Sequence, residues 1–433
     1  MLHKAQNDLI TRTDAGTPGG ELMRRYWHPV ALSEELSSDT PVPTRIFGED
    51  LVLFRAPDGR PQLIGRYCPH RGVDLSYGRL DNGGVRCLYH GWLLTGDGRC
   101  TEQPGEPASS SFKDKIRHPA YPCHEAGGLI LTYLGPGKPP RLPDYPFMRC
   151  AAEQVWCTKI YHDCNYLQGN EGNLDPQHLS FLHVAFGAQN SLDPSINDLI
   201  ANDVAPDLDI EETPFGFRIF TMRKANADQM GVRVTNFIMP NSSAFDGVPL
   251  VDPKKEPPRA NLGYQIHWHV PIDDGSHWKY TVLYRYEGAV DKDLMSKVFF
   301  GELQDYRSPR NAQNRYLQNR GEMKSNTFAG VGRNYYDQDL LAVETQGRIM
   351  DRSNEHLGTT DRPIILMRKQ LLKAVEDVRA GRDPLFIERD GDPNALQELI
   401  VRASTVPAST DIKGAWWREQ TAATRGRAHE PAE

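Results

Sequence analysis

The sequence predicts an α+β fold, with a smaller antiparallel β-domain followed by a larger domain built on a twisted antiparallel sheet flanked by helices. Three observations carry this prediction. The chain has 433 residues, which is too long for one ordinary hydrophobic core. Apolar and polar residues alternate from Thr44 onward and again in the second half, as half-buried strands require. A run rich in proline and glycine over residues 135–146 separates the two parts.

The first part is expected to begin with a short helix and to continue as strands. Residues 17–27 place Thr17 where an N-cap belongs and Pro18 at the first helical position. A β-hairpin is predicted around Asp58-Gly59, because the alternation runs up to this turn and resumes after it. The strands expected in this part are 46–54, 62–67 and 127–133.

The second part is expected to mix strands and helices. Its strands alternate like members of an antiparallel sheet, and the last two are joined across a turn at residues 273–275. These strands are 218–223, 232–239, 263–270 and 278–286. Residues 364–380 repeat apolar side chains at helical spacing and stop at Gly381, which predicts a long amphipathic helix. The charged tail after Ala423 is expected to be frayed.

Composition and charge narrow the classes of function. The net charge is −7 and no long Lys/Arg run occurs, which argues against a nucleic-acid partner. No apolar run approaches the roughly 20 residues that a membrane helix needs. The N-terminal residues have no apolar core of the secretory kind, so we expect a cytoplasmic protein. Chemistry on a small molecule is the remaining expectation.

The cysteines indicate metal ligands and free thiols rather than disulfides. There are seven, an odd number, and in a reducing compartment disulfides are rare. Five of them show no metal-ligand spacing and are expected to be ordinary thiols: Cys100, Cys123, Cys150, Cys157 and Cys164.

The other two cysteines each belong to a segment that also carries a histidine. The segments are Cys-Pro-His-Arg-Gly and Cys-Leu-Tyr-His-Gly-Trp, and their candidate ligands are Cys68, His70, Cys87 and His90. Two thiolates and two imidazoles suit a [2Fe–2S] cluster with Cys on one iron and His on the other. Gly72 and Gly91 follow the two pairs, where a side chain would crowd the backbone N–H groups. The alternative is a zinc site, but zinc fingers place two Cys before two His.

These two segments resemble the Rieske oxygenases, the ring-hydroxylating non-haem iron family. Residues 16–29, Gly-Thr-Pro-Gly-Gly-Glu-Leu-Met-Arg-Arg-Tyr-Trp-His-Pro, are similar to the N-terminus of the phthalate dioxygenase group of that family. The resemblance implies a helical segment over 1–40 and a Rieske β-sandwich over 41–145. It also implies a catalytic domain of the helix-grip, START-like kind over 146–433, which carries a mononuclear Fe(II).

A second candidate metal site lies in residues 165–183. His178 and His183 are five residues apart, close to one helical turn, so both imidazoles can face one ion. Two His and one carboxylate form the facial triad of non-haem Fe(II) oxygenases. Taken alone, the pair is more simply two hydrogen-bonded histidines on a helix. The surrounding pattern is similar to the iron-binding signature of the Rieske oxygenases, which favours the metal site.

For the third ligand the resemblance points to Asp361, just before the long helix. Asp361 also suits the N-cap of that helix, and one carboxylate oxygen can cap while the other binds iron. Asp351 is the second candidate. His267 and His269 form a His-x-His pair, which we interpret as alternating sheet residues rather than as ligands.

The resemblance also implies a ring of subunits, a homotrimer or stacked trimers, in which one subunit's cluster lies beside the next subunit's iron. Asp175 matches the acid that links the two centres in this family. Its carboxylate would accept hydrogen bonds from His178 and from His90 of the neighbour. From the local sequence alone, a capping role before Pro176 is an equally good interpretation.

The resemblance implies the terminal oxygenase component of a multicomponent system, which uses O2 and electrons from a separate NAD(P)H-dependent reductase. The phthalate dioxygenase-like N-terminus suggests an aromatic carboxylate as substrate. Arginines on strands of the second part are candidates to bind that carboxylate: Arg218, Arg223 and Arg233.

Two alternatives remain open from the sequence. An O-demethylating Rieske monooxygenase that acts on a methoxylated aromatic acid shares every motif. A Rieske electron carrier without catalysis is the other, and the length of the chain argues against it, since such carriers are single β-domains of roughly 100 residues.

Overall fold

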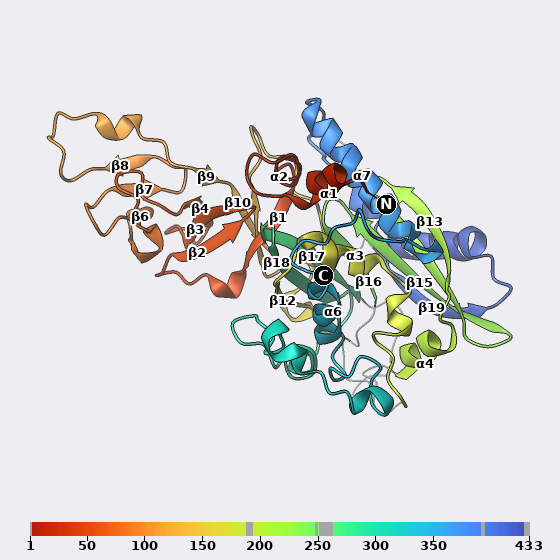
Figure 1. Ribbon diagram of the computed structural model, residues 1–433. Coiled ribbons are helices and arrows are strands. Elements are labelled where there is room, and N and C mark those ends of the chain that lie inside the picture. Colours follow the sequence, from red (N-terminus) through yellow and green to blue (C-terminus); the bar gives the residue numbers. More distant parts are fainter. Residues whose placement is uncertain (1, 188–193, 247–249, 251–262, 391–394, 428–433) are drawn as a thin grey trace.

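The computed structural model describes residues 2–187, 194–246, 250, 263–390 and 395–427. It confirms the predicted α+β fold: a β-rich part lies at one end and a larger part with a sheet and helices at the other (Figure 1). Every strand pairing within the sheets is antiparallel. No helix in these residues is long and apolar enough to cross a membrane.

The β-rich part is a sandwich of two four-stranded sheets. The first has the order β2 (Val42–Ile46), β3 (Glu49–Arg55), β4 (Pro61–Gly65) and β9 (Ala120–Tyr121). The second has the order β5 (Arg79–Asp81), β6 (Gly84–Arg86), β7 (Leu93–Thr95) and β8 (Cys100–Glu102). Apolar residues of both sheets, such as Phe54 and Leu94, share one core that also contains Cys68 and Cys87. The predicted hairpin is confirmed as β3 and β4.

A third, three-stranded sheet lies between the two parts. Its order is β1 (Trp27–Leu32), β11 (Leu129–Tyr133) and β10 (Cys123–Ala126). The sandwich therefore leaves and rejoins the rest of the chain through neighbouring strands (Figure 1). The predicted boundaries at residues 41 and 145 stay a prediction, and the pairing of β1 shows that residues 27–32 join the sheet that closes the sandwich.

Two short helices precede β1 and pack on the larger part. They are α1 (Lys4–Thr11) and α2 (Pro18–Met23), and both contact α7 (Arg362–Arg379). The predicted cap is confirmed: the Thr17 hydroxyl accepts a hydrogen bond from the backbone N–H of Gly20, 3.0 Å away. The N-terminal segment thus braces the larger part.

The larger part is built on one eight-stranded sheet. Its strands, in order across the sheet, are β12 (Val155–His162), β18 (Ser276–Arg285), β17 (Gly263–Asp273), β16 (Ser242–Phe245), β15 (Gln229–Ile238), β14 (Gly216–Lys224) and β13 (Asp207–Thr213), and β19 (Arg402–Pro407) pairs with β15. The four strands predicted from alternation are confirmed as β14, β15, β17 and β18.

Helices cover both faces of this sheet. On one face lie α3 (Tyr166–Leu174), α6 (Tyr335–Glu344) and the predicted long helix, α7; α4 (Pro194–Asn202) contacts β14. The short helix α5 (Lys292–Leu294) follows β18. On the other face α8 (Trp417–Arg427) packs through Trp417 against Phe220. Neither β19 nor α8 was predicted, and the end of the tail, 428–433, lies outside the described residues.

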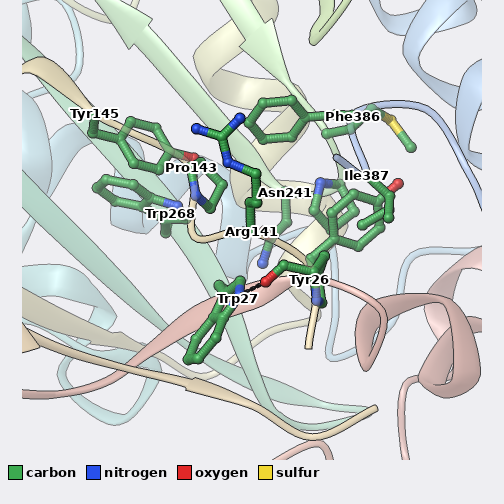
Figure 2. Close-up of a pocket in the computed structure, with 12 residues that line it drawn as sticks. Tyr26, Trp27, Arg141, Pro143, Tyr145, Asn241, Trp268, Phe386 and Ile387 are labelled. Carbon is green, nitrogen blue, oxygen red and sulfur yellow. Dashed lines mark hydrogen bonds between the residues drawn. The ribbon is translucent and has the colours of Figure 1, made fainter. Parts of the chain in front are cut away.

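A small pocket opens where the two parts meet, and its lining is shown in Figure 2. Its walls include Tyr26, Trp27, Tyr145 and Trp268, and it offers about 10 Å³ of space, room for about one water molecule. In β17 the side chain of Trp268 points to the opposite face from its neighbours His267 and His269. The pocket therefore lies across the sheet from the candidate metal site described below.

Two candidate metal centres

Cys68, His70, Cys87 and His90 lie on two turns with the same hydrogen-bond pattern. In each turn the cysteine carbonyl accepts a hydrogen bond from the glycine four residues on, at 2.8 Å from Gly72 and 3.0 Å from Gly91. Both glycines have φ of +73°, a conformation that side chains disfavour. The expected crowding is not the reason for Gly72, since a Cβ there would meet no atom within 4 Å. The two thiols are buried and the two imidazoles are exposed.

This donor set fits a [2Fe–2S] cluster with its cysteine side inward and its histidine side outward. The ring centroids of His70 and His90 are 4.5 Å apart, so the imidazoles face one space. Trp92 stacks on His70 at 4.6 Å and fixes its ring. Burial raises the pKa of Cys68 to about 11, and the Cys87 thiol beside it adds to the shift. Such thiols ionise when a metal binds them, so the site is built for a metal and not for free thiolates.

The second centre joins His178 and His183 to Asp339, a residue of α6. The Nε2 atoms of the two histidines are 3.2 Å apart. The Oδ1 atom of Asp339 lies 3.1 Å from Nε2 of His183 and 3.7 Å from Nε2 of His178. These three ligand atoms lie within 4.8 Å of one another, as binding to one ion requires. Two imidazoles and one carboxylate are the ligand set expected for Fe(II).

The outer nitrogen of each imidazole is held by an oxygen acceptor. His178 Nδ1 donates to the backbone carbonyl of Asp175 at 2.6 Å, and His183 Nδ1 donates to Oε1 of Gln338 at 2.7 Å. Each Nδ1 therefore carries the hydrogen, and each Nε2 presents a lone pair. Two lone pairs and a carboxylate that face one another repel unless a cation lies between them. The set of three donors therefore fits a metal ion.

The electrostatics of Asp339 agree with this arrangement. Burial would raise the pKa of Asp339, but positive charge beside it, including the ammonium of Lys279, holds the pKa below its usual range. The carboxylate is therefore ionised at neutral pH and available to a cation.

The histidines do not share a helix, which differs from the expected helical turn. Helix α3 ends at Leu174, and His178 begins a short 3₁₀ turn, His178–Ser180. Arg223 holds this turn, because it donates to the carbonyl of Pro176 at 2.5 Å and to the hydroxyl of Ser180 at 2.8 Å. Convergence of the two rings thus depends on a clamped turn rather than on helical periodicity.

The structure does not place the predicted third ligand in this cluster. The carboxylate of Asp361 accepts from the backbone N–H of Gly358 at 2.6 Å, at the start of α7. Asp351, the second candidate, is exposed and accepts from Ser353 and Asn354. Asp361 and Asp351 therefore serve local turns, and Asp339 replaces them as the candidate ligand.

Asp175 has the local contacts of a cap in the single chain. Its carboxylate accepts from the backbone N–H groups of Gln177 at 2.7 Å and His178 at 3.3 Å. The other carboxylate oxygen lies 3.8 Å from Nδ1 of His178. The carbonyl of Asp175, and not its carboxylate, binds that nitrogen. The predicted contact with His90 of a neighbour is not tested by one chain.

The three predicted arginines fall into different surroundings. Arg218 and Arg223 are five residues apart on β14, so they point to opposite faces of the sheet. Arg218 lies 4.9 Å from the ring centroid of Trp417, on the face away from the histidines, which does not suit a substrate ligand. Arg223 is engaged with the turn described above, and burial lowers its pKa to about 10. Arg233 lies over the Phe245 ring at 5.1 Å, on the same face as His267, and donates to the carbonyl of Asp246.

His267 and His269 lie in β17, as predicted, and belong to a buried chain of hydrogen bonds. The side-chain amide of Asn173 donates to Nε2 of His269 at 2.8 Å and lies 3.3 Å from Nδ1 of His267. Nδ1 of His269 is hydrogen-bonded to Nε2 of His277 at 3.0 Å, and Nδ1 of His277 donates to the carbonyl of Cys164 at 2.7 Å. A carbonyl at one end and an amide donor at the other fix the tautomer of each ring. Burial holds the pKa of His269 well below its usual range, so its ring is neutral.

Sequence reasoning missed several residues of this centre: Gln338, Asp339, Asn173 and Lys279. Asp339 lies on a helix 156 residues beyond His183 in the sequence. The available signal was the pattern Asp337-Gln338-Asp339 inside a largely apolar helix, where an acid on the buried side needs a partner.

Comparison with known proteins shows which family the chain belongs to. A model of the Rieske [2Fe-2S] domain matches residues 26–118, and a model described as LigXa C-terminal domain like matches residues 132–430. The chain is 36% identical, over 424 residues, to the phthalate 4,5-dioxygenase oxygenase subunit of Pseudomonas putida, which covers 92% of this chain and 91% of the relative. The chain belongs to the Rieske oxygenases.

As a Rieske oxygenase, the chain is the terminal oxygenase of its system, an oxidoreductase whose cofactors are a Rieske [2Fe–2S] cluster and a mononuclear iron. A second relative is the 5,5'-dehydrodivanillate O-demethylase oxygenase subunit of a Sphingobium species, 32% identical over 90% of this chain and 84% of the relative. The predictions of the family, of catalysis and of the two cofactors are confirmed, and the electron-carrier alternative is excluded.

Solved structures of Rieske oxygenases share the fold. The terminal oxygenase of carbazole 1,9a-dioxygenase from a Novosphingobium species superposes with a TM-score of 0.57 at 22% identity, over 86% of this chain and 95% of that chain. Dicamba monooxygenase bound to dicamba superposes with a TM-score of 0.57 at 18% identity, over 83% of this chain and 99% of that chain. At these identities the likeness shows the arrangement of the two domains.

Proposed function

We propose that this Rieske oxygenase oxidises an aromatic carboxylate, most simply by dioxygenation of the ring. The observation that carries the proposal is the buried Lys279 beside the candidate iron ligand Asp339, with Arg233 on the same face of the sheet. The similarity to phthalate 4,5-dioxygenase, over nearly the whole of both chains, supports the same substrate class.

We assign the ligands from the geometry of the two centres. The cluster would be held by Cys68, His70, Cys87 and His90, and the iron by His178, His183 and Asp339. When bound, the cluster supplies electrons one at a time, and the iron supplies the site at which O2 is activated.

The protein's own groups orient the ligands. Gln338 and the carbonyl of Asp175 fix the two imidazoles so that both Nε2 atoms face inward. The hydrogen-bonded histidines of β17 and β18 are neutral and buried, so they line the centre without adding charge. Lys279 and Arg233 are then the charged side chains on this face of the sheet that can bind a substrate.

Electrons are proposed to come from a separate NAD(P)H-dependent reductase, in the cytoplasm. Both cluster histidines are exposed, and large apolar side chains are exposed around them. These side chains are Tyr67, Tyr77, Leu88, Tyr89 and Phe112. A patch of this kind is typical of a contact surface.

The same patch supports the proposed ring of subunits, a homotrimer or stacked trimers. Exposed aromatic side chains also lie near the iron centre, where the ring centroids of Phe181 and Phe328 are 5.7 Å apart. Two apolar surfaces at opposite ends of one chain favour head-to-tail association.

In the proposed ring of subunits, Asp175 would link His178 to His90 of the neighbour. We expect Asp175→Asn, which keeps the cap, to slow re-oxidation of the reduced cluster in a single turnover. Normal re-oxidation would leave Asp175 with the capping role alone.

The test of the function is oxygen uptake with a reductase and a panel of aromatic acids and their amides, followed by identification of products. Phthalate isomers, benzoate and methoxybenzoates belong in the panel. We expect oxygen uptake, with product, for an acid and not for its amide. Uptake for neutral aromatics alone would contradict the proposal.

A second candidate is O-demethylation of a methoxylated aromatic acid, which the 32% identity to the dehydrodivanillate O-demethylase subunit favours. Formaldehyde and a phenol in stoichiometric amounts would identify this reaction. A cis-dihydrodiol would identify the first.

A further inference from the structure

Lys279 is a buried cation beside the candidate iron centre. It lies in β18, opposite His269 of β17, and only 2% of its surface is exposed. Its side chain is on the face of the sheet that carries His267 and that α6 covers. Lysine is rarely buried without a counter-ion, so its position calls for a reason.

The ammonium of Lys279 has few partners for its charge and its hydrogen bonds. Nζ lies 3.8 Å from Oδ2 of Asp339, beyond hydrogen-bond distance, and 4.8 Å from the ring centroid of Tyr336. Among the described residues it has no hydrogen-bond acceptor and no second ion pair. Tyr336 itself donates to Oε1 of Gln265 at 3.2 Å, so its hydroxyl is directed elsewhere. The ammonium therefore keeps its three N–H donors without a hydrogen-bond acceptor among the described residues.

The neighbours of Lys279 do not balance its charge. His267, His269 and His277 are neutral, because each accepts on one nitrogen and donates on the other. Within the part of the chain that the structure describes, Asp339 is the only acid paired with Lys279, and in the proposed centre it binds Fe(II). With the metal in place, the centre carries one carboxylate against a divalent ion and an ammonium. The buried site is therefore positive by two charges.

A buried excess of positive charge favours an anionic ligand. We propose that Lys279 anchors the negatively charged group of the substrate, which is the carboxylate of an aromatic acid. The inference rests on the proposed function and deepens it, since it names the residue that selects acids. An ammonium with three free donors matches a carboxylate with several lone pairs, and the contact is strong where water is excluded.

The test is equilibrium binding without turnover. Anaerobic calorimetry on the iron-loaded enzyme, with the cluster oxidised and no reductase, compares phthalate with phthalamide, which has the same shape without the charge. Lys279→Met keeps the length and apolar stem of the side chain and removes the charge. We expect Lys279→Met to raise the Kd of phthalate at least about tenfold and to change that of phthalamide about twofold or less.

Two further variants control the result. Lys279→Arg keeps the charge and should retain most of the preference for phthalate. Lys159→Met removes another buried lysine of the same sheet, one that is paired with Glu35 at 2.5 Å, and should leave both Kd values unchanged. Iron content measured for each protein shows whether the centre has survived, and Lys279→Gln takes the place of Lys279→Met if iron is lost.

The outcomes separate this inference from the function. If phthalate and phthalamide weaken equally in Lys279→Met, Lys279 serves to position Asp339, and the inference is wrong while the function stands. An unchanged Kd for phthalate has the same meaning. A wild-type enzyme that binds neither phthalate nor 3-chlorobenzoate more tightly than the matching amide overturns both.

Discussion

The carboxylate of Asp339 faces two imidazole lone pairs, and this arrangement gives the first prediction at the scale of single residues. Asp339→Ala should lose the mononuclear iron and all turnover, because two imidazoles alone bind Fe(II) poorly. The Rieske spectrum should remain, since the cluster ligands lie in the other domain. Iron analysis together with the visible spectrum measures both effects.

Asp361→Ala is the matched control for Asp339→Ala. It removes only the acceptor of the Gly358 N–H in the turn before α7, so it should cost about 1 kcal/mol of stability or less and leave iron and turnover unchanged. Retention of iron in Asp339→Ala, or its loss in Asp361→Ala, would restore Asp361 as the ligand.

Gln338 gives the second prediction, since its Oε1 holds the Nδ1–H of His183 at 2.7 Å. Gln338→Leu leaves this N–H unpaired and should weaken iron binding about 10- to 100-fold. Gln338→Glu keeps the acceptor and should retain the metal. Competition with a chelator measures the affinity directly. Equal affinity in wild type and Gln338→Leu would show that packing alone orients His183.

Single residues mark where sequence reasoning reached its limit. The two histidines and the four proposed cluster ligands could be named from the sequence because each set is local in the chain. Asp361 was chosen for its position before a helix, but its side chain does not cap α7 and accepts instead from Gly358 in the preceding turn. Asp339 and Lys279 come from distant elements, and only the folded sheet and α6 bring them to the histidines. Alternation along β14 could already have separated Arg218 from Arg223.

At the scale of elements, strand β1 carries a histidine that makes stability depend on pH. His28 is fully buried, and its Nε2 lies 2.8 Å from the carbonyl of Met23. Burial lowers its pKa to about 4, below the usual value of about 6.5. The unfolded chain therefore binds a proton between these pH values and the folded chain does not. His28 contributes full stability above pH 6.5, and the contribution is lost as pH falls toward 4.

The third prediction concerns replacement of that histidine. His28→Gln keeps a donor toward Met23 but does not titrate, so the loss of stability between pH 6.5 and 4 should shrink by on the order of 3 kcal/mol. Thermal unfolding at a series of pH values measures the change. Parallel pH profiles for wild type and His28→Gln would show that other groups account for the acid sensitivity.

Whole elements were predicted more reliably than their ends. Strands with strict alternation were found because one face is buried and the other is not. The end of α3 at Leu174 was missed, because the helical spacing of His178 and His183 continues past the cap at Asp175. Strand β19 and helix α8 were missed because their apolar residues, such as Val406 and Trp417, are sparse among polar ones and pack on a distant strand.

At the scale of the whole molecule, the proposed ring of subunits gives the fourth prediction. A Cys68→Ser protein lacks the cluster, and a His178→Ala protein lacks the iron, so each should be inactive alone. If electrons pass between neighbouring subunits, mixed oligomers of the two should regain part of the activity. Co-expression with two different tags isolates the mixed oligomers, and turnover per mixed oligomer is the measurement.

The control for this experiment is a mixture of each variant with itself. No turnover in the mixed oligomers, with wild-type oligomers active under the same conditions, would mean that electrons stay within one chain.

The pairing of β1 with β11 has a consequence for how such enzymes diversify. Residues 33–128 depart after Leu32 and return at Leu129, and these two residues face each other in the ladder. The redox domain is thus an insertion whose two ends are joined by strand pairing. It is also anchored to the larger part, because Leu51 and Leu53 share a hydrophobic core with Trp268, and the backbone N–H of Phe47 donates to the carbonyl of Pro271. Exchange for a domain of another potential therefore has to keep these contacts, so the two centres evolve under the constraint of a common interface.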